Sequence, residues 1–462
     1  MIKQVASGAS TRHAKSIASK IALLLVLLLS AFIQFTVVTH TEVINPFHAD
    51  AREYFFSAYN LDHYGVYSSE VTWPPEQHVQ PPHADAVATP GYPLFLRLIG
   101  HPEPTIEFER RVKLVQAALG VLSVWMMYLI AARFLRRGWA CLAALLTAIS
   151  PHLAVSSTYM LTESLFFFLL LACVLGVMYA IESTKRWPLV LVGLLWGLCS
   201  LVRSTTVFMP IVALLAALAI PRLKQFRTST LLMFLGFAAV MSPWLIRNAD
   251  LPPHTTQSSK MVKFLLHGSY PNFMYKNNPA TYGDPYRWDP DGEGLSRNLP
   301  GVLTHIAQNF KHDPFTTTRW YLIGKPGFLL AWTNIDSWTR RGGGDIFVFP
   351  VTSSPFRDDW RFVLIRGAAY ILHWPLMLLG LIGACLPWWR PQRWGLSGEP
   401  LIAARLVSLV VLYAIGFHMI GAPYPRYGIP FRPLLYPLAL AALLALRHAR
   451  RSPPPGSVST TV

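Results

Sequence analysis

Charged residues are scarce in this sequence, since only 14% of its 462 residues are Asp, Glu, Lys or Arg. An ordinary globular protein has about 25%, so the low charge argues against a soluble enzyme. Cysteine is scarce too. The four cysteines lie in apolar runs without metal-ligand spacing such as CxxC; they are Cys141, Cys173, Cys199 and Cys385. Their number and spacing argue against a disulfide framework and against a structural zinc site.

Apolar and basic residues are abundant instead. Hydrophobic residues make up 53% of the chain, the mean hydropathy is +0.36, and there are 15 Trp. In a soluble protein the net charge of +17 would point to an anionic partner such as nucleic acid. In a chain this apolar, basic residues more readily mark the cytoplasmic loops of a membrane protein. We therefore expect a polytopic membrane protein and no nucleic-acid partner.

Long uncharged runs predict the membrane-spanning helices. The first run, residues 21–38, would be about 27 Å long as a helix, close to the roughly 30 Å of a hydrocarbon core. No convincing signal-peptide cleavage site precedes Asn45 and many apolar runs follow, so we expect a retained span. The further apolar runs are 114–134, 139–157, 161–181, 188–202, 205–220, 231–246, 362–389, 401–420 and 433–446. Together they predict an all-α polytopic membrane protein with about ten transmembrane helices.

Basic residues predict the orientation of these spans. With a cytoplasmic N-terminus, nearly every short inside loop carries Arg or Lys, as the positive-inside rule requires. The expected parts are a cytoplasmic tail (1–20), the first span (21–38), a first periplasmic loop with interfacial helices (39–113), a transmembrane core (114–246), a periplasmic loop region (247–361), C-terminal spans (362–446) and a cytoplasmic tail (447–462). We expect a bacterial inner-membrane protein with both termini in the cytoplasm. A broken apolar stretch at 320–332 predicts an amphipathic or re-entrant element rather than a span.

An acidic residue, Asp50, lies just after the first span, in a segment that reads as a short amphipathic helix along the membrane. A carboxylate there is well placed to act on a substrate whose reactive end sits among the lipid headgroups. Taken alone, Asp50 would more often be an ordinary solvated residue. The arrangement resembles the GT-C superfamily of membrane glycosyltransferases, in the branch of protein mannosyltransferases and lipid A aminoarabinose transferases, which use polyprenyl-phosphate-linked sugars.

Further motifs extend the resemblance along the chain. They are Thr162-Glu163-Ser164, Leu201-Val202-Arg203-Ser204, Pro243-Trp244-Leu245-Ile246-Arg247-Asn248 and Pro425-Arg426-Tyr427. Arg203, Arg247 and Arg426 lie at outer ends of spans, against the positive-inside bias, and the planar fork of Arg suits a lipid phosphate. For any one of them, contact with lipid headgroups is an equally good explanation. Glu163 has the alternative of a buried structural pair with Arg203.

The resemblance implies roles for individual residues. Asp50 is expected to be the catalytic base, with Glu163 as a second candidate or as the group that orients a substrate. The residues expected to bind the donor phosphate are Arg203, Arg247, Arg426 and Arg52. The tyrosines expected to contact substrate are Tyr54, Tyr59, Tyr92 and Tyr427. Aromatic residues in outside segments are also common interfacial anchors.

A metal requirement is not predicted. The pattern His48-Ala49-Asp50 recurs as His83-Ala84-Asp85, but without a fixed spacing between the pairs coincidence is the better account. The acidic run from Asp289 to Glu293 reads as a turn because Pro290 and Gly292 interrupt it. No metal ligand and no required cofactor is assigned, although the resemblance allows a divalent cation, because some GT-C relatives use one.

The expected function is transfer of a sugar from a polyprenyl-phosphate donor to a lipid, glycan or protein acceptor of the cell envelope, with inversion at the anomeric carbon. Residues 88–91, Ala-Thr-Pro-Gly, stand where aminoarabinose transferases carry an acidic-Lys-Pro segment. A hexosyltransferase is therefore expected at least as much as a pentosyltransferase with aminoarabinose specificity. The alternatives are a transporter or lipid flippase, and a non-catalytic scaffold. Transporters place their sites near the membrane midplane, whereas the candidate charges here gather at one face.

Overall fold

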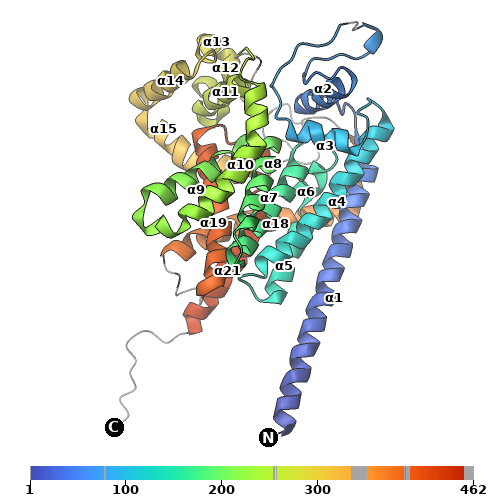
Figure 1. The fold of residues 1–462 in the computed structure, drawn as a ribbon, viewed down its shortest axis with the longest axis vertical. Helices are drawn as coiled ribbons and strands as arrows, with labels where there is room; N and C mark the ends of the chain where they lie inside the picture. Colours follow the sequence, from blue (N-terminus) through green and yellow to red (C-terminus); the bar gives the residue numbers. More distant parts are fainter. Residues whose placement is uncertain are drawn as a thin grey trace.

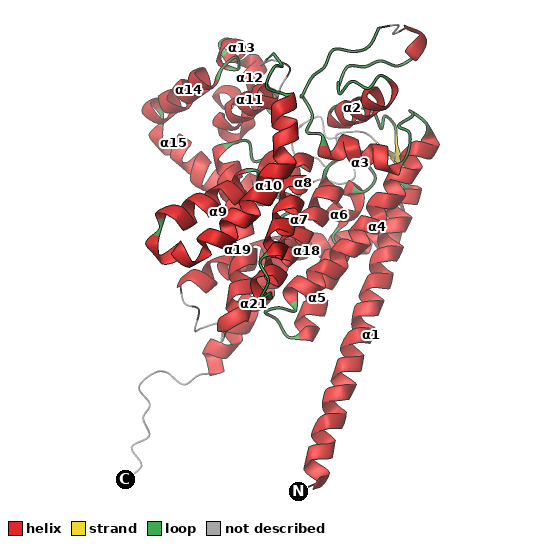
Figure 2. Cartoon of the chain, viewed as in Figure 1, coloured by secondary structure: helices red, strands yellow, loops and turns green. Residues whose placement is uncertain are grey.

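The protein is described by a computed structural model. It describes residues 2–77, 80–252, 255, 257–333, 351–389, 391 and 396–451. Helices dominate this part of the chain (Figure 2). One small antiparallel pair of strands, β1 (Glu42–Val43) and β2 (Val351–Ser353), joins the end of the first helix to the segment before α18. The helical membrane-protein fold expected from the sequence is confirmed.

Helices form most of the first half of the chain, and the longer ones overlap the apolar runs. They are α1 (Ile2–His40), α2 (Asp50–His63), α3 (Gly91–Ile99), α4 (Ile106–Ala131), α5 (Arg137–Ala148), α6 (Pro151–Ser156), α7 (Glu163–Glu182), α8 (Trp187–Val202), α9 (Phe208–Ala219) and α10 (Arg227–Arg247). Short 3₁₀ turns lie at Pro75–Gln77, Ser204–Thr206 and Pro221–Phe226.

The second half begins with short helices and ends with long ones. They are α11 (Gln257–Ser269), α12 (Pro285–Trp288), α13 (Gly292–Leu295), α14 (Leu299–His312), α15 (Pro314–Arg319), α16 (Lys325–Leu330), α17 (Pro355–Asp358), α18 (Trp360–Trp389), α19 (Gly398–Ile420), α20 (Pro425–Gly428) and α21 (Arg432–Arg451). Further 3₁₀ turns lie at Pro271–Phe273, Tyr275–Asn277 and Pro279–Thr281, and a π-helical turn, η8, at Trp320–Gly324.

Six of the described helices contain a segment long and apolar enough to cross a membrane: Ile17–His40, Ile106–Ala131, Glu163–Glu182, Pro221–Arg247, Trp360–Trp389 and Gly398–Ile420. Helices α5, α8 and α9 are apolar but shorter. The expected number of ten spans is therefore not established. One reason is visible at 139–157, where α5 ends at Ala148 and α6 begins at Pro151, since Pro cannot continue the hydrogen bonding of a helix.

The fourth helix begins at Ile106, earlier than the boundary of 113 expected for the first loop. Thr105 caps it by accepting a hydrogen bond from the Phe108 amide. Charged residues fill its first two turns, which explains why the apolar run in the sequence starts later than the helix; they are Glu107, Glu109, Arg110, Arg111 and Lys113.

Glycine brings two of the inner helices close together. A Cβ added to Gly193 of α8 would meet the backbone of Met233 in α10, and one added to Gly236 of α10 would meet the backbone of Val190 in α8. Small residues at a helix–helix contact allow this close approach, which is a common way to pack helices in membranes. The contact holds α8, whose C-terminal end carries Arg203, in a fixed position.

The expected amphipathic or re-entrant element at 320–332 is part of a continuous helical segment. Helix α15, η8 and α16 follow one another from Pro314 to Leu330. Lys325 is buried there, and its ammonium group donates to the carbonyl oxygens of Met419 (2.9 Å) and Gly421 (2.9 Å) at the end of α19. A cation at a helix C-terminus stabilises the unpaired carbonyls, so this segment is tied to the bundle through its lysine.

Both ends of the described chain lie at one end of the bundle. Figure 1 shows the start of α1 and the end of α21 at the bottom, and α2, α3 and α11–α14 at the top. The long segments expected outside the membrane therefore gather at the end opposite the termini. This arrangement agrees with the expected orientation. Which end of the bundle faces the cytoplasm stays a prediction.

Cysteine labelling tests that prediction. In a Cys385→Ser background, we expect His101→Cys and Pro290→Cys, both at exposed positions, to react with a membrane-impermeant thiol reagent in intact cells. Arg222→Cys, in the turn between α9 and α10, should react only after the cells are permeabilised. The reverse pattern in folded protein would show that the orientation is wrong.

Candidate active site

Helix α2 places Asp50 at its first residue. The preceding residue, Ala49, has φ 47° and ψ −127°, a conformation that is costly for a residue with a side chain. The chain therefore turns sharply out of the first span before α2 begins. The positive end of the helix dipole favours a carboxylate at this position, and the side chain of Asp50 is 40% exposed.

Three more elements bring charged residues to Asp50. Glu163 is the first residue of α7, Arg203 follows the last residue of α8, and Arg426 is the second residue of α20. Each lies at the end of a helix rather than within one. The ends of helices that are far apart in the sequence therefore meet at one point, which we call the charged centre (Asp50, Glu163, Arg203 and Arg426).

Ion pairs link all four residues of the charged centre. Arg426 donates to Asp50 through Nη2, and its Nε lies 3.3 Å from Oε1 of Glu163. Nη1 of Arg203 donates to the same Oε1 at 3.1 Å. Glu163 is buried, and its Oε2 has no hydrogen-bond partner. Two carboxylates thus face two guanidinium groups, with one carboxylate oxygen left as an acceptor.

Arg426 controls the protonation of Asp50. Partial shielding from water by itself would raise the pKa of the Asp50 carboxyl. The charge and hydrogen bond of Arg426, together with the charges of Lys260 and Arg203, outweigh this effect and hold that pKa below its ordinary value. Asp50 is therefore ionised, and the same pairing raises the pKa of Arg426. As long as the pair is intact, Asp50 is a weak base.

Aromatic rings line part of the charged centre. The guanidinium of Arg203 lies 4.7 Å from the centre of the Tyr427 ring, and that of Arg426 lies 5.8 Å from it. Tyr54, one turn along α2 from Asp50, packs edge-to-face on Tyr92 at 5.3 Å. The Tyr92 hydroxyl donates to Gln116 and is fully buried. Tyr54 and Tyr427 are thus near the charges, whereas Tyr92 supports them from behind.

The first outside loop docks on the end of α8 through Thr89 and Gly91. The Thr89 hydroxyl donates to the carbonyl oxygen of Val202 at 3.1 Å. A Cβ on Gly91 would lie 2.5 Å from the amide nitrogen of Val202 and 2.7 Å from the carbonyl oxygen of Leu201. Only glycine permits this approach, which places the loop directly beside Arg203.

We expect Gly91→Ala to disturb this contact. The added methyl group must push α3 away from α8, which costs about 1–3 kcal/mol of stability and shifts the residue that precedes Arg203. Unfolding in detergent and glycosyl-transfer kinetics measure the two effects. Gly367→Ala is the matched control, because nothing lies within 4 Å of an added Cβ there. Equal behaviour of the two variants would contradict the proposed docking.

Three of the expected site residues lie elsewhere. Arg247 donates to the carbonyl oxygens of Asp85 (2.6 Å) and Tyr67 (2.9 Å), so it holds the first loop. Arg52 is on the exposed side of α2, and no ion pair joins it to a described carboxylate. Tyr59 is buried and stacks on His63 with ring centres 3.9 Å apart. Position at the outer end of a span did not distinguish Arg247 from the arginines of the charged centre.

The charged centre does not fit a divalent cation. Both of its carboxylates are already paired with arginine, and the described residues contain no group of three or more His, Cys, Asp or Glu side chains able to hold a metal ion. Asp85, from the repeated His-Ala-Asp pattern, accepts hydrogen bonds from the Ser69 amide and hydroxyl, each at 2.7 Å. It shapes the loop instead of meeting Asp50.

Other residues near the charged centre were hard to recognise from the sequence. Lys260 of α11 pairs with Glu53 of α2 and so joins the two outside segments. Gln116 of α4 accepts from Tyr92 and donates to the carbonyl oxygens of Ser157 (3.1 Å) and Tyr159 (2.8 Å). A lone glutamine in an apolar run was the one hint available for Gln116.

This fold and this charged centre define a helical integral membrane protein whose polar site lies at one end of its bundle. Residues 94–246 match the family described as dolichyl-phosphate-mannose-protein mannosyltransferase. The resemblance to the GT-C superfamily of membrane glycosyltransferases is thereby confirmed. The matched segment contains Glu163 and Arg203, whereas Asp50 and Arg426 lie outside it.

Solved structures of two membrane enzymes resemble the chain. The oligosaccharyltransferase AglB from Archaeoglobus fulgidus, in complex with an inhibitory peptide and a dolichol-phosphate, is 14% identical with a TM-score of 0.47; the alignment covers 95% of this chain and 51% of AglB. ArnT from Cupriavidus metallidurans, bound to undecaprenyl phosphate, is 12% identical with a TM-score of 0.37; coverage is 94% of this chain and 78% of ArnT. The chain thus spans about half the length of AglB. No curated protein matches it in sequence.

Proposed function

We propose that the chain transfers a sugar from a polyprenyl-phosphate donor to an acceptor of the cell envelope, at the outer face of a bacterial inner membrane. The observation that supports this proposal is the charged centre, in which Asp50 and Glu163 meet Arg203 and Arg426 at the ends of helices. A site at this level is suited to a substrate with its tail in the bilayer and its reactive end among the headgroups. The matched family is itself named for a donor of this kind.

The arginines of the charged centre are suited to the donor phosphate. A guanidinium group can give two parallel hydrogen bonds to phosphate oxygens. Arg203 and Arg426 are 12% and 13% exposed at their side chains, so they are shielded from water and still within reach of a ligand. A phosphate would compete with the two carboxylates for these groups, while Tyr427 remains against both guanidinium planes.

Donor binding would also activate the base. When Arg426 turns to the phosphate, its hydrogen bond to Asp50 is lost and the pKa of Asp50 rises towards its ordinary value and beyond, because burial is then opposed less. Asp50 becomes a better proton acceptor in the complex than in the free enzyme. The ion pair therefore keeps the base weak until a donor is present.

The reaction itself needs few groups. The acceptor hydroxyl oxygen forms a bond to the anomeric carbon, the bond from that carbon to the phosphate oxygen breaks, and the phosphate leaves with the electron pair. Asp50 takes the acceptor proton, and the free Oε2 of Glu163 accepts a hydrogen bond from a hydroxyl of the donor sugar or the acceptor. Attack from the face opposite the phosphate inverts the anomeric carbon. Lipid, glycan and protein hydroxyls all meet this requirement.

The test is release of the lipid phosphate. Purified protein is supplied with polyprenyl-phosphate sugars that differ in the sugar, together with an extract of cell-envelope acceptors, and free polyprenyl phosphate and the glycosylated product are measured. Sugar-dependent release with product formation supports the proposal. Movement of the intact donor between leaflets without release would favour the transporter or flippase alternative and would overturn it.

A further inference from the structure

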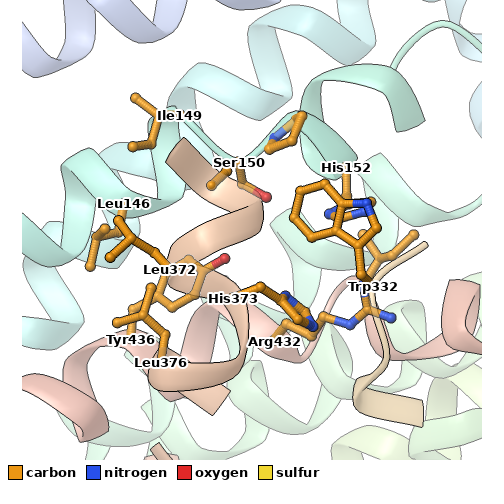
Figure 3. A pocket seen from close by; sticks show the side chains of 13 residues that line it. Leu146, Ile149, Ser150, His152, Trp332, Leu372, His373, Leu376, Arg432 and Tyr436 are labelled. Carbon is orange, nitrogen blue, oxygen red and sulfur yellow. The ribbon is translucent and has the colours of Figure 1, made fainter. Parts of the chain in front are cut away.

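A second polar pocket lies away from the charged centre, between the α5–α6 junction, α18 and α21. Its enclosed space is small, about 20 Å³, which is room for a water molecule, and the pocket is open on one side. Figure 3 shows its two sides: His152, Trp332, His373 and Arg432 gather on one, and the apolar side chains of Leu146, Ile149, Leu372 and Leu376 on the other. Polar and apolar side chains thus line opposite sides of one small pocket.

Arg432, the first residue of α21, is a buried cation without a described counter-ion. It is 3% exposed. Its guanidinium donates to the hydroxyl of Thr333 (3.1 Å) and to the carbonyl oxygens of Leu329 (3.2 Å) and Pro425 (2.6 Å). None of these groups carries a charge, and Nε has no hydrogen-bond partner. An isolated buried charge is costly unless an anion joins it.

Two histidines add further polar capacity. Nε2 of His152 lies 2.8 Å from the carbonyl oxygen of Thr333, and Nε2 of His373 lies 2.7 Å from that of Leu330. A ring nitrogen beside a carbonyl carries the proton, which leaves Nδ1 of each ring as the group able to take up a second one. A second proton on either ring is unfavourable beside the guanidinium of Arg432, so the hydrogen-bond donors for an anion come from Arg432.

The mouth of the pocket faces the lipid chains. Leu372, on its apolar side, is 41% exposed, and it belongs to α18, a candidate span whose most apolar window is only 28% buried. An apolar side chain exposed on such a helix contacts hydrocarbon in a membrane. A ligand entering here therefore has an apolar tail as well as an anionic head.

The pocket is separate from the charged centre although the two are close in sequence. Phe431 packs on Phe166 with ring centres 5.7 Å apart, and Phe166 lies 5.9 Å from the guanidinium of Arg203. The next residue, Arg432, lines the second pocket (Figure 3). Phe431 thus packs towards the charged centre, whereas Arg432 belongs to the second pocket.

We propose that this pocket binds the phosphate head of an anionic membrane lipid, with Arg432 as its main ligand and the lipid chain leaving between α5 and α18. The proposal does not depend on glycosyl transfer, because it concerns a lipid that is held beside the reaction and is not consumed. Its link to the charged centre is the Pro425 carbonyl, which Arg432 bonds and which directly precedes Arg426.

Native mass spectrometry of the purified full chain tests the proposal. The probes are phosphatidic acid, phosphatidylglycerol, polyprenyl phosphate, phosphatidylcholine and inorganic phosphate. We expect an anionic lipid to bind, and both Arg432→Gln and Leu372→Trp to weaken this binding about tenfold or more, the first by removing the charge-assisted hydrogen bonds and the second by filling the mouth. Leu372→Trp keeps the test open if Arg432→Gln fails to fold.

Matched variants distinguish lipid bound in this pocket from lipid bound at another cation of the protein. Arg405→Gln removes a cation that also bonds a carbonyl, that of Pro387, and should leave binding unchanged. Asp50→Asn should also leave it unchanged, so failure of the proposed enzyme function would not be mistaken for failure of this site. A preference for polyprenyl phosphate over the two phospholipids that is lost in Arg432→Gln and Leu372→Trp would identify the donor lipid as the source.

Two results would overturn the proposal. One is equal binding of phosphatidylcholine or inorganic phosphate, since neither combines a net negative charge with a lipid tail. The other is anionic-lipid binding that the two pocket variants leave intact, because Arg432 would then be neutralised within the chain.

Discussion

Replacing Asp50 by Asn is expected to lower turnover by about 10²–10⁴-fold, the usual contribution of a general base, with little change in the affinity for the donor. The amide keeps the size of the side chain but cannot take a proton from the acceptor. Release of polyprenyl phosphate and formation of product measure the effect. Full activity of Asp50→Asn in folded protein would eliminate Asp50 as the base.

Asp62→Asn is the control for this variant. Asp62 is on the same helix and also binds basic side chains, Arg97 at 3.1 Å and His101 at 2.9 Å, but it lies away from the charged centre. Its variant should retain the wild-type rate. A loss of activity in both variants would point to a general weakening of α2.

The pH profile adds a second measure of the same role. Because Arg426 holds the pKa of Asp50 below its ordinary value in the free enzyme, kcat/KM should show no loss from protonation of Asp50 as the pH falls from 7 to about 5. In the donor complex Arg426 is engaged elsewhere, so the acid limb of kcat should lie at higher pH than that of kcat/KM. Coincident limbs would argue against release of Asp50 by the donor.

Glu163→Gln is expected to destabilise the protein by about 3–5 kcal/mol as well as to inactivate it, since removal of one partner leaves a buried cation without compensation. Glu163 is 3% exposed and binds both Arg203 and Arg426. The double variant Glu163→Gln/Arg203→Gln should recover most of the lost stability and remain inactive. Unfolding in detergent and the transfer assay measure the two properties separately.

The control for the Glu163 variants is the more exposed Arg133–Glu182 ion pair, which joins the ends of α4 and α7. Glu182 is 33% exposed at its side chain, so Glu182→Gln should change stability by less than about 1 kcal/mol and leave activity unaffected. If the Glu163 double variant regains activity together with stability, Glu163 has only a structural role.

The apolar runs predicted the arrangement of the long helices because hydropathy and helix length directly reflect the bilayer. Their ends were less predictable. The break before Pro151 divides one expected span, and the charged first turns of α4 extend another beyond its apolar run. Local capping and proline sterics set such boundaries, and they have little effect on average hydropathy.

The candidate site was predictable in part. Asp50, Glu163, Arg203 and Arg426 were singled out by residue type and by position at the end of a span, and they do meet. The same criterion included Arg247, whose partners are backbone carbonyls of the first loop. It missed Arg432, because a basic residue near the start of the last apolar run resembles an ordinary flanking charge. Tertiary partners decide between these cases.

The Asp50–Arg426 pair joins residues 376 positions apart in the chain. During synthesis, α2 is complete long before α20 leaves the ribosome, so a nascent chain has the acid without its cation. The last helices must be inserted before the charged centre can close. A chain that stops short of α20 would therefore hold most of its candidate spans but lack the cation that pairs with Asp50, its proposed base.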